Sequence, residues 1–460
     1  MPTVHQDEMK PINPSEPMKP AKNTAYEAEF SDLIARANKE GILDEENRWV
    51  YFIDEARIIE RAKEVKLAFP RTTKHCFALK ANPCPAVLKF FVSLGFGLEC
   101  ASIEEVMQAL RVPGIDPANV VFDGPCKTAK EISFALEKGV YLNVDNLTEL
   151  KRVEEAVKSL PEGSSPKVGL RINPQVGAGS IAATSTATKY AKFGIPLQEA
   201  RSEILEAAKT LPFIVGLHVH VGSGGMHFDT LCAGVKAVVD LADELRASGK
   251  ALDYVDIGGG FPIEHMASDL AGTLPFEAYY KQLREATGPS LDLYTLVTEF
   301  GRALIGHAGT IVSAVEYDRE AGGRHIATVH FGADMLVWTT YTHEEMLRVP
   351  FATYSKDGAL KYIENQYVHD DEADTLATVD LVGPLCFSYD TIAFERKIPT
   401  SLVPVAGDHV AMFNTGAYTF AVWSKFNSRA SPRIVAIDMD RKMRIIKEKE
   451  SIDDNLAFWG

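Results

Sequence analysis

Charged and polar side chains stand at the ends of the most apolar segments of this sequence. One such residue is commonly an ordinary structural group, but seven at the same relative position indicate a shared rim. A shared rim would bring amine, imidazole, guanidinium and carboxylate groups together, as acid–base and covalent catalysis require. The seven residues are Lys80, Glu99, Asp123, Asp145, Arg171, His220 and Glu299.

Lys80 ends an apolar segment directly before Ala81-Asn82-Pro83. Taken alone, a lysine in this position is most often a solvated residue where a strand emerges. A lysine that is kept partly desolvated loses its proton more readily and can form an imine with an aldehyde. The second interpretation requires other reactive groups around Lys80.

A glycine turn provides the first of these groups. Gly258, Gly259 and Gly260 follow an apolar segment, and they match neither the dinucleotide fingerprint nor the P-loop. Glycines at such a turn let backbone N–H groups approach an anion closely, although ordinary tight turns use glycines too. Ser223 offers a further donor for a phosphate group.

Glu299 and Arg302 complete a coherent chemical set. A carboxylate at a barrel mouth can keep a pyridinium nitrogen protonated, which makes the ring an electron sink for a carbanion. Arg302 and the glycine turn would hold a phosphate, His220 would lie against the ring, and Lys80 would carry the aldehyde. The set therefore predicts a pyridoxal-phosphate site, although a plain surface pair of Glu299 with Arg302 is the alternative for those two residues.

The elements that must position these residues alternate between short apolar segments and stretches of helical period. Strands separated by helices predict parallel βαβ units, and eight of them in one stretch predict a (β/α)8 barrel. A doubly wound open sheet is the alternative. The eight apolar segments lie near 76–82, 95–102, 120–125, 141–146, 167–174, 214–223, 254–260 and 295–302.

The pattern changes after residue 303, where apolar segments follow one another with few helical stretches between them. This part predicts a mainly antiparallel β domain. The expected organisation is a flexible N-terminal arm with a short helix at 1–45, and a strand at 46–54 that joins the β domain. The barrel is expected at 55–303 and the β domain at 304–460.

Ten segments of the chain resemble the ornithine/diaminopimelate decarboxylase family, which shares the alanine-racemase-like barrel and uses pyridoxal phosphate. They occur in family order over roughly residues 48–440, and ten in order are far more specific than any one of them. They are FALKAN (77–82), GLECAS (97–102), FDGPCK (122–127), LRINP (170–174), KFGIP (192–196), HVHVGSG (218–224), DIGGGFP (256–262), EFGR (299–302), GPLC (383–386) and NTGAYTF (414–420).

The resemblance implies a role for each matching residue. Lys80 would hold the cofactor, His220 would stack on its ring and Glu299 would face its ring nitrogen. Cys386 would donate a proton in the partner subunit's active site, which implies a homodimer with shared sites; a buried apolar cysteine is the alternative. The implied phosphate-binding positions are Ser223, Gly260, Gly301, Arg302 and Tyr418, and the implied supporting positions are Glu99 and Arg171.

The substrate's far end is where the chain departs from the family pattern. Phe387 follows Cys386 where the family carries an acidic residue, and Phe331 falls where ornithine-type enzymes carry an aspartate. Asp334 or Asp390 would then receive a distal amine. We expect a basic diamino acid, ornithine or lysine, to be decarboxylated to a diamine for polyamine synthesis. Diaminopimelate, or another modified or less polar amino acid, is the alternative.

Two rival classes share this barrel. A racemase uses the same fold and cofactor, but it protonates with a tyrosine rather than a cysteine, and release of carbon dioxide would separate the two. A binding or regulatory relative tends to lose cofactor residues, whereas this chain keeps Lys80, His220, Glu299, Arg302 and Cys386.

Composition narrows the class further. The net charge of −15 with scattered basic residues argues against nucleic-acid binding. No apolar run reaches the roughly 18 residues of a membrane span, no secretory signal is evident, and the expected location is the cytoplasm. No cysteine or histidine cluster has the spacing of a metal site, so no metal is expected.

Overall fold

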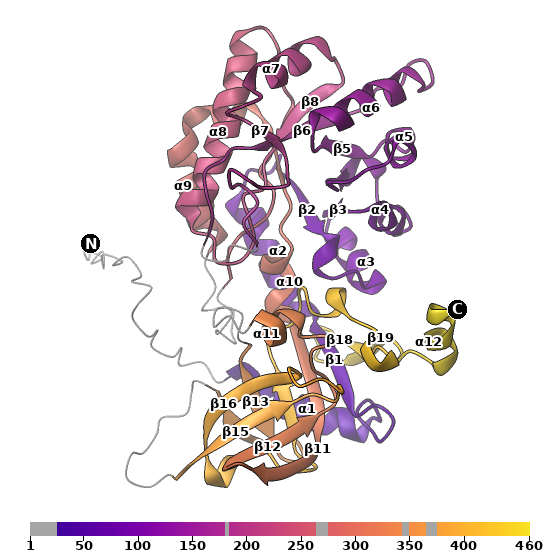
Figure 1. Cartoon of the computed structure of the whole chain (residues 1–460), viewed down its shortest axis with the longest axis vertical. Helices are drawn as coiled ribbons and strands as arrows, with labels where there is room; N and C mark the ends of the chain where they lie inside the picture. Colours follow the sequence, from indigo (N-terminus) through magenta and orange to yellow (C-terminus); the bar gives the residue numbers. More distant parts are fainter. Residues whose placement is uncertain (1–24, 180–183, 264–274, 343–348, 365–374) are drawn as a thin grey trace, which may run out of the picture.

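The computed structural model describes residues 25–179, 184–263, 275–342, 349–364 and 375–460. Two sheets organise these residues, with a helix-covered barrel in the upper half of Figure 1 and a second sheet below it. The predicted flexible arm falls on residues 1–24, which lie outside the described residues. We propose domain boundaries after residues 45, 54 and 303.

The first sheet is a closed barrel of eight parallel strands, since β10 pairs with β2 and β5 pairs with β6. This closure confirms the (β/α)8 prediction over the doubly wound sheet. A short strand, β7 (Ile195–Pro196), pairs with β6 outside the circle. The barrel strands are β2 (Lys74–Ala78), β3 (Gly97–Cys100), β4 (Val120–Phe122), β5 (Tyr141–Val144), β6 (Val168–Asn173), β8 (Ile214–His218), β9 (Tyr254–Asp256) and β10 (Thr295–Thr298).

Helices surround the barrel, and capping residues start several of them soon after a strand ends. Ser102 and Asn146 accept backbone N–H groups in the first turns of α4 and α6, and Thr128 with Glu131 forms a capping box on α5. Short strand-to-helix loops therefore collect on one rim. The helices are α2 (Glu55–Ala68), α3 (Pro85–Ser93), α4 (Ile103–Ala109), α5 (Ala129–Glu137), α6 (Leu147–Lys158), α7 (Arg201–Thr210), α8 (Phe228–Ala247) and α9 (Phe276–Thr287).

The second sheet has ten strands, and it takes in β1 (Trp49–Asp54), which precedes the barrel in the sequence. β1 lies between β11 and β18, antiparallel to the first and parallel to the second. Apart from β12 with β15, the other pairs are antiparallel. The remaining strands are β11 (Gly309–Ala321), β12 (Arg324–Val329), β13 (Phe351–Tyr354), β14 (Leu360–Ile363), β15 (Leu376–Val382), β16 (Thr391–Pro399), β17 (His409–Met412), β18 (Arg433–Ile437) and β19 (Met443–Lys447).

Helix α1 (Ala25–Lys39) covers one face of this second sheet. Phe30 on α1 is buried and meets Phe52 of β1 and Phe413 edge-on, with ring centroids 6.0 and 5.6 Å apart. The sequence predicted a short helix here, and burial of its apolar face accounts for its place on the sheet.

The barrel joins the second sheet through α10 (Arg302–Ile305) and the short helix η6 (Gly306–Ala308). The joint is tight, because a Cβ added to Gly416 would lie 1.8 Å from the carbonyl oxygen of Ile305. His307 is buried in this joint, and its Nδ1 lies 2.7 Å from Oδ1 of Asn414. Helix α12 (Ile452–Trp459) follows the last strand. None of the described helices is both long and apolar enough to cross a membrane.

Candidate active site

Lys80 lies in a short helix, η1 (Leu79–Ala81), directly after β2. Its Nζ donates to both carboxylate oxygens of Glu99, which is fully buried on β3, at 2.7 Å each. Desolvation opposes the charge on Lys80, but Glu99, Tyr418 and Glu299 together outweigh it and raise the pKa of Lys80 above its ordinary value. The structure thus brings Lys80 and Glu99 together as an ion pair, and this pairing favours the charged form of the lysine.

Glu299 stands directly after β10, and its side chain is buried in the barrel. Its backbone N–H donates to the carbonyl oxygen of Gly258 at 2.8 Å, which fixes it beside the glycine turn. Burial and then the charge of Asp256 raise the pKa of Glu299 well above its usual range. Its Oε1 is buried without a hydrogen-bond partner among the described residues.

The glycine turn requires glycine at two positions. Gly258 and Gly260 have φ angles of +65° and +87°, which side chains disfavour. A Cβ on Gly260 would lie 2.0 Å from the carbonyl oxygen of Gly222, and a Cβ on Gly259 would lie 2.6 Å from that of Glu299. The turn is therefore pressed against both neighbouring strand ends.

His220 is held by the same turn. The N–H of Gly259 donates to Nδ1 of His220 at 3.1 Å. Desolvation, with the nearby positive charge of Lys80, lowers the pKa of His220 well below its ordinary value. The ring is therefore neutral with its proton on Nε2.

Arg302 begins α10 and stacks on Tyr418, with its Cζ 4.6 Å from the ring centroid. Its Nε is buried without a hydrogen-bond partner among the described residues. The N–H of Tyr418 donates to the carbonyl oxygen of Ala81 at 2.8 Å, which ties this pair to the turn that carries Lys80. Gly301 packs closely there, since an added Cβ would lie 2.9 Å from Cβ of Ala81. Ser223 donates its backbone N–H to Thr184 at 3.0 Å.

These residues fit pyridoxal phosphate. Two buried polar atoms, Oε1 of Glu299 and Nε of Arg302, have no hydrogen-bond partner among the described residues. Oε1 of Glu299 would accept from a protonated ring nitrogen, and Nε of Arg302 would donate to a phosphate oxygen. Lys80 would supply the amine for the aldehyde, and the close-packed glycine turn would leave its backbone accessible to the phosphate. We propose these roles for the four elements.

Arg171 lies on β6, and its Nη1 is 3.6 Å from Oδ1 of Asp145, the residue that follows β5. Its guanidinium also covers the ring of Phe193, with the Cζ 4.6 Å from the ring centroid. Arg171 and Asp145 are both buried at the rim of the barrel, in keeping with the supporting role proposed for Arg171.

Three further polar residues, not predicted from the sequence, lie inside the barrel. His218, at the end of β8, places its Nε2 3.6 Å from Asp123 and 3.5 Å from Glu299. Asn143 donates to Oδ1 of Asp123 at 2.6 Å, and Asp256 ends β9. Residues two apart in a strand share a face, so the His-Val-His segment could have indicated that His218 points into the barrel with His220.

Cys386 lies in the connection between β15 and β16 and is exposed. Its N–H donates to Oδ1 of Asn427 at 2.9 Å. Among the described residues, no recorded hydrogen bond joins Cys386 to the barrel mouth of its own chain. The structure therefore gathers the other predicted catalytic residues but leaves Cys386 on the outside.

Phe387 follows Cys386 and is half-buried among three exposed aromatic rings. Its ring centroid lies 5.5 Å from that of Tyr341, 5.6 Å from Tyr389 and 6.2 Å from Phe426. The neighbourhood of the position after the cysteine is thus aromatic rather than acidic.

Asp390 and Asp334 have partners within their own chain. The Asp390 carboxylate accepts the N–H groups of Ala333 and Leu385, both at 2.6 Å. Asp334 accepts from Nε of Arg429 at 3.0 Å. These contacts give both carboxylates a bracing role, and the expected contact with a substrate amine stays a prediction.

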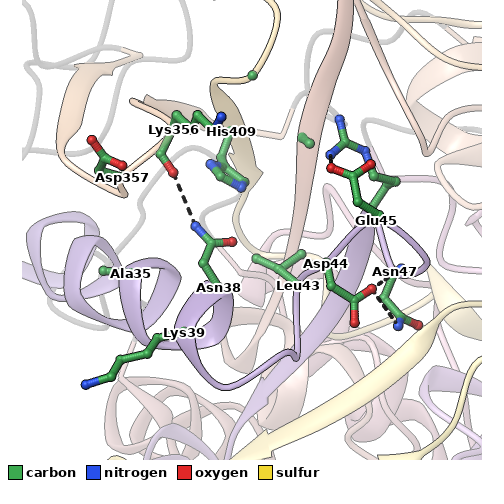
Figure 2. Close-up of a pocket in the computed structure, with 13 residues that line it drawn as sticks. Ala35, Asn38, Lys39, Leu43, Asp44, Glu45, Asn47, Lys356, Asp357 and His409 are labelled. Carbon is green, nitrogen blue, oxygen red and sulfur yellow. Dashed lines mark hydrogen bonds and ion pairs between the residues drawn. The ribbon is translucent and has the colours of Figure 1, made fainter.

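A separate hollow of about 720 Å³ lies between α1, the following loop and the second sheet (Figure 2). Lys39, Asp44, Lys356 and Asp357 give its lining mixed charge, and Asn38 donates to the carbonyl oxygen of Lys356 at 3.2 Å. Its described lining residues include none of the predicted site residues. The hollow therefore belongs to the second sheet and not to the site.

The fold and the site together define a barrel enzyme of the pyridoxal-phosphate class. Residues 55–306 match the family model described as pyridoxal-dependent decarboxylase, pyridoxal binding domain. The chain is 31% identical over 409 residues to a diaminopimelate decarboxylase of Helicobacter pylori, which covers 88% of this chain and 93% of that protein. It is 29% identical over 438 residues to a diaminopimelate decarboxylase of Methanothermobacter thermautotrophicus, which covers 92% and 94%.

Solved structures agree. Diaminopimelate decarboxylase from Helicobacter pylori, complexed with L-lysine, superposes with a TM-score of 0.77 at 27% identity over 92% of this chain and 99% of that one. The arginine decarboxylase of Paramecium bursaria Chlorella virus shares the fold, with a TM-score of 0.72 at 21% identity over 88% and 100%. The chain belongs to the ornithine/diaminopimelate decarboxylase family, and it is a pyridoxal-phosphate-dependent carboxy-lyase that acts on an amino acid.

Proposed function

We propose that this enzyme decarboxylates diaminopimelate to lysine. The observation that carries the proposal is the 31% identity to a diaminopimelate decarboxylase over 88% of this chain and 93% of that protein. From the sequence alone we expected ornithine or lysine as substrate and a polyamine pathway, and the comparisons support the alternative, diaminopimelate, better.

Each residue at the barrel mouth has a different proposed role in decarboxylation. Pyridoxal phosphate, when bound, supplies an electron-accepting ring for the carbanion that remains after carbon dioxide leaves. Glu299 would offer a carboxylate to the ring nitrogen, and neutral His220 would face the ring without adding charge. Arg302 and the glycine turn would hold the phosphate and fix the orientation that the reaction needs.

Glu99 positions Lys80. Both oxygens of Glu99 accept from Nζ at 2.7 Å, which orients the amine and favours its charged form. A charged lysine is a poor nucleophile, so Nζ would have to pass a proton to another group before it could react with an aldehyde.

Cys386 acts in the neighbouring subunit of a homodimer. Its exposed position suits a residue that reaches another protein surface, and the aromatic cluster beside it gives that surface apolar character. In this arrangement the thiol of Cys386 would supply the proton that the product needs, at a site where Lys80 of the other chain would carry the cofactor.

A less polar substrate is a second candidate. Phe387 and its neighbours Tyr341, Tyr389 and Phe426 place aromatic rings where an acidic residue would meet a distal amine. Such rings suit an apolar side chain, or a cation held against their faces.

A substrate panel tests the proposal. Purified protein supplied with pyridoxal phosphate is assayed for carbon dioxide release from meso-diaminopimelate, ornithine, lysine and apolar amino acids. We expect diaminopimelate to give a kcat/KM roughly tenfold or more above the others. A higher kcat/KM for ornithine or for an apolar amino acid would overturn the assignment. Phe387→Asp should shift preference toward basic diamino acids if Phe387 faces the substrate.

A further inference from the structure

Several ionisable groups surround the Glu299 carboxylate inside the barrel. Asp123 and His218 approach it from β4 and β8. One ring nitrogen of His218 and one carboxylate oxygen each of Asp123 and Glu299 lie within 4.8 Å of one another. Asp256 approaches from β9, and Glu99 and Lys80 complete the ring of charges. Asp123, His218, Asp256 and Glu299 are all buried.

The cations nearest to this cluster are engaged elsewhere. Lys80 donates to Glu99, and Arg171 pairs with Asp145. His218 does not compensate, since desolvation lowers its pKa to about 4 and leaves the ring neutral near pH 7. Three carboxyl groups therefore share a buried space with a neutral imidazole, and keeping all of them ionised would cost far more than retaining a proton.

Asp123 and Glu299 each place a carboxylate oxygen within 4.8 Å of the other's. A hydrogen bond between two carboxyl groups requires a proton on one of them, because two ionised carboxylates offer no donor. Burial raises the pKa of both groups, but their mutual contact raises the pKa of Asp123 further and lowers that of Glu299, which favours Asp123 as the holder. Oδ1 of Asp123 accepts from Asn143, which leaves Oδ2 for an O–H group. Asp256 is a poorer holder. Burial raises its pKa to about 7, but its Oδ1 accepts the N–H of Gly258 at 2.9 Å, a contact that favours the ionised form.

We propose that Asp123 retains the buried proton and donates it in a hydrogen bond to Glu299, so that Glu299 stays a carboxylate with Oε1 directed at the ring nitrogen. Asp123 is then a positioning residue that acts through Glu299. The inference rests on the proposed role of Glu299, but not on which amino acid is the substrate. If Glu299 carried the proton itself, it would be neutral and could not stabilise a protonated ring nitrogen.

The first test reads the proton directly in the full-length protein without cofactor. Infrared spectra of protein with ¹³C-labelled aspartate or glutamate carboxyl groups are recorded near pH 8. We expect a protonated-carboxyl band that moves with labelled aspartate, disappears in Asp123→Asn and persists in Asp256→Asn. Asp380→Asn, which removes a buried acid of β15, is the control and should keep the band. A band that moves with labelled glutamate, or that survives Asp123→Asn, would overturn the proposal, and the labelling in the wild type decides even if a variant fails to fold.

The second test uses the direction of a shift in the protein loaded with pyridoxal phosphate. Asp123→Leu removes the donor, so Glu299 should take up a proton at a pH higher by about one unit or more, seen as a pH-dependent change in the cofactor absorbance. Asp123→Asn keeps an N–H donor and should restore the wild-type profile. If Asp123 were ionised instead, its loss would remove a negative charge and move the transition to lower pH. Both readouts are independent of turnover, so they separate this inference from the choice of substrate.

Discussion

At the scale of single residues, burial and neighbours decide the charge of each site group more than residue type does. Lys80 keeps its proton because Glu99 lies 2.7 Å away, whereas His220 is neutral because it is desolvated beside that cation. The sequence was sufficient to find both, since each ends an apolar strand. It could not reveal that Asp334 and Asp390 are used by partners from distant segments, because that depends on tertiary contacts.

The Lys80 assignment makes a residue-scale prediction. Lys80→Ala should abolish turnover and the visible absorbance of lysine-bound cofactor, because Nζ is the only atom of the side chain that can attack the aldehyde. Absorbance spectra and carbon dioxide release are the measurements. Lys361→Ala, a lysine paired with Asp408 in the second sheet, is the matched control and should retain both signals. Normal turnover in Lys80→Ala would refute the assignment.

At the scale of elements, the loop that carries Cys386 is braced by one carboxylate. Asp390 fills a space bounded by two glycines, since an added Cβ on Gly332 or Gly383 would lie 2.0 or 2.3 Å from its oxygens. The barrel strands were predictable because each is a short apolar segment followed by a helix. β13, β14 and β16 were not, because β13 and β14 have only four residues each and β16 carries the charged run Glu395-Arg396-Lys397 in its middle.

The brace predicts a separation of cofactor binding from turnover. Asp390→Ala leaves the N–H groups of Ala333 and Leu385 without acceptors, which should lower the free energy of unfolding by roughly 2 kcal/mol or more. It should also displace Cys386 and reduce kcat while cofactor absorbance is kept. Denaturant unfolding and steady-state kinetics measure these effects. Asp390→Asn retains one acceptor oxygen and should fall between the two, whereas equal stability of the alanine variant and the wild type would contradict the brace.

The joint between the two sheets predicts a dependence of stability on pH. Burial lowers the pKa of His307 from its ordinary 6.5 to about 4, so the folded state binds this proton more weakly than the unfolded chain does. The contribution of His307 is fully present above pH 6.5 and is lost as the pH falls toward about 4. His307→Gln should remove part of that loss, measured as the slope of unfolding free energy between these pH values. An unchanged slope would mean that His307 does not titrate in this range.

At the scale of the whole molecule, the sequence analysis predicted both the barrel and the following β sheet, because periodicity changes sharply near residue 303. The proposed homodimer goes beyond one chain, and exposure of Cys386 is its main physical support. The position of Cys386 relative to a partner's site could not be predicted from the sequence. It depends on the contact surface between two chains, and no periodic pattern of residues marks such a surface.

The shared-site proposal predicts complementation between two inactive proteins. A hybrid of Lys80→Ala and Cys386→Ala subunits has one site with both residues intact, so an equal mixture after subunit exchange should recover about a quarter of wild-type activity. Turnover of the mixture is compared with each variant alone, and exchange is verified with differently tagged subunits. Proven exchange without recovery would exclude a site built from Lys80 and Cys386 of different chains.

The place of β1 between β11 and β18 has a consequence for synthesis on the ribosome. The barrel strands are contiguous in the sequence and can close while translation continues, but β1 must wait for both of its neighbours, the second of which is made near the end of the chain. A nascent chain therefore carries an apolar strand with two unpaired edges for most of its synthesis, which invites chaperone binding or aggregation. A fragment that ends after the barrel lacks both pairing partners of β1, so β1 would stay unpaired in it. A stable barrel fragment should therefore begin after residue 54.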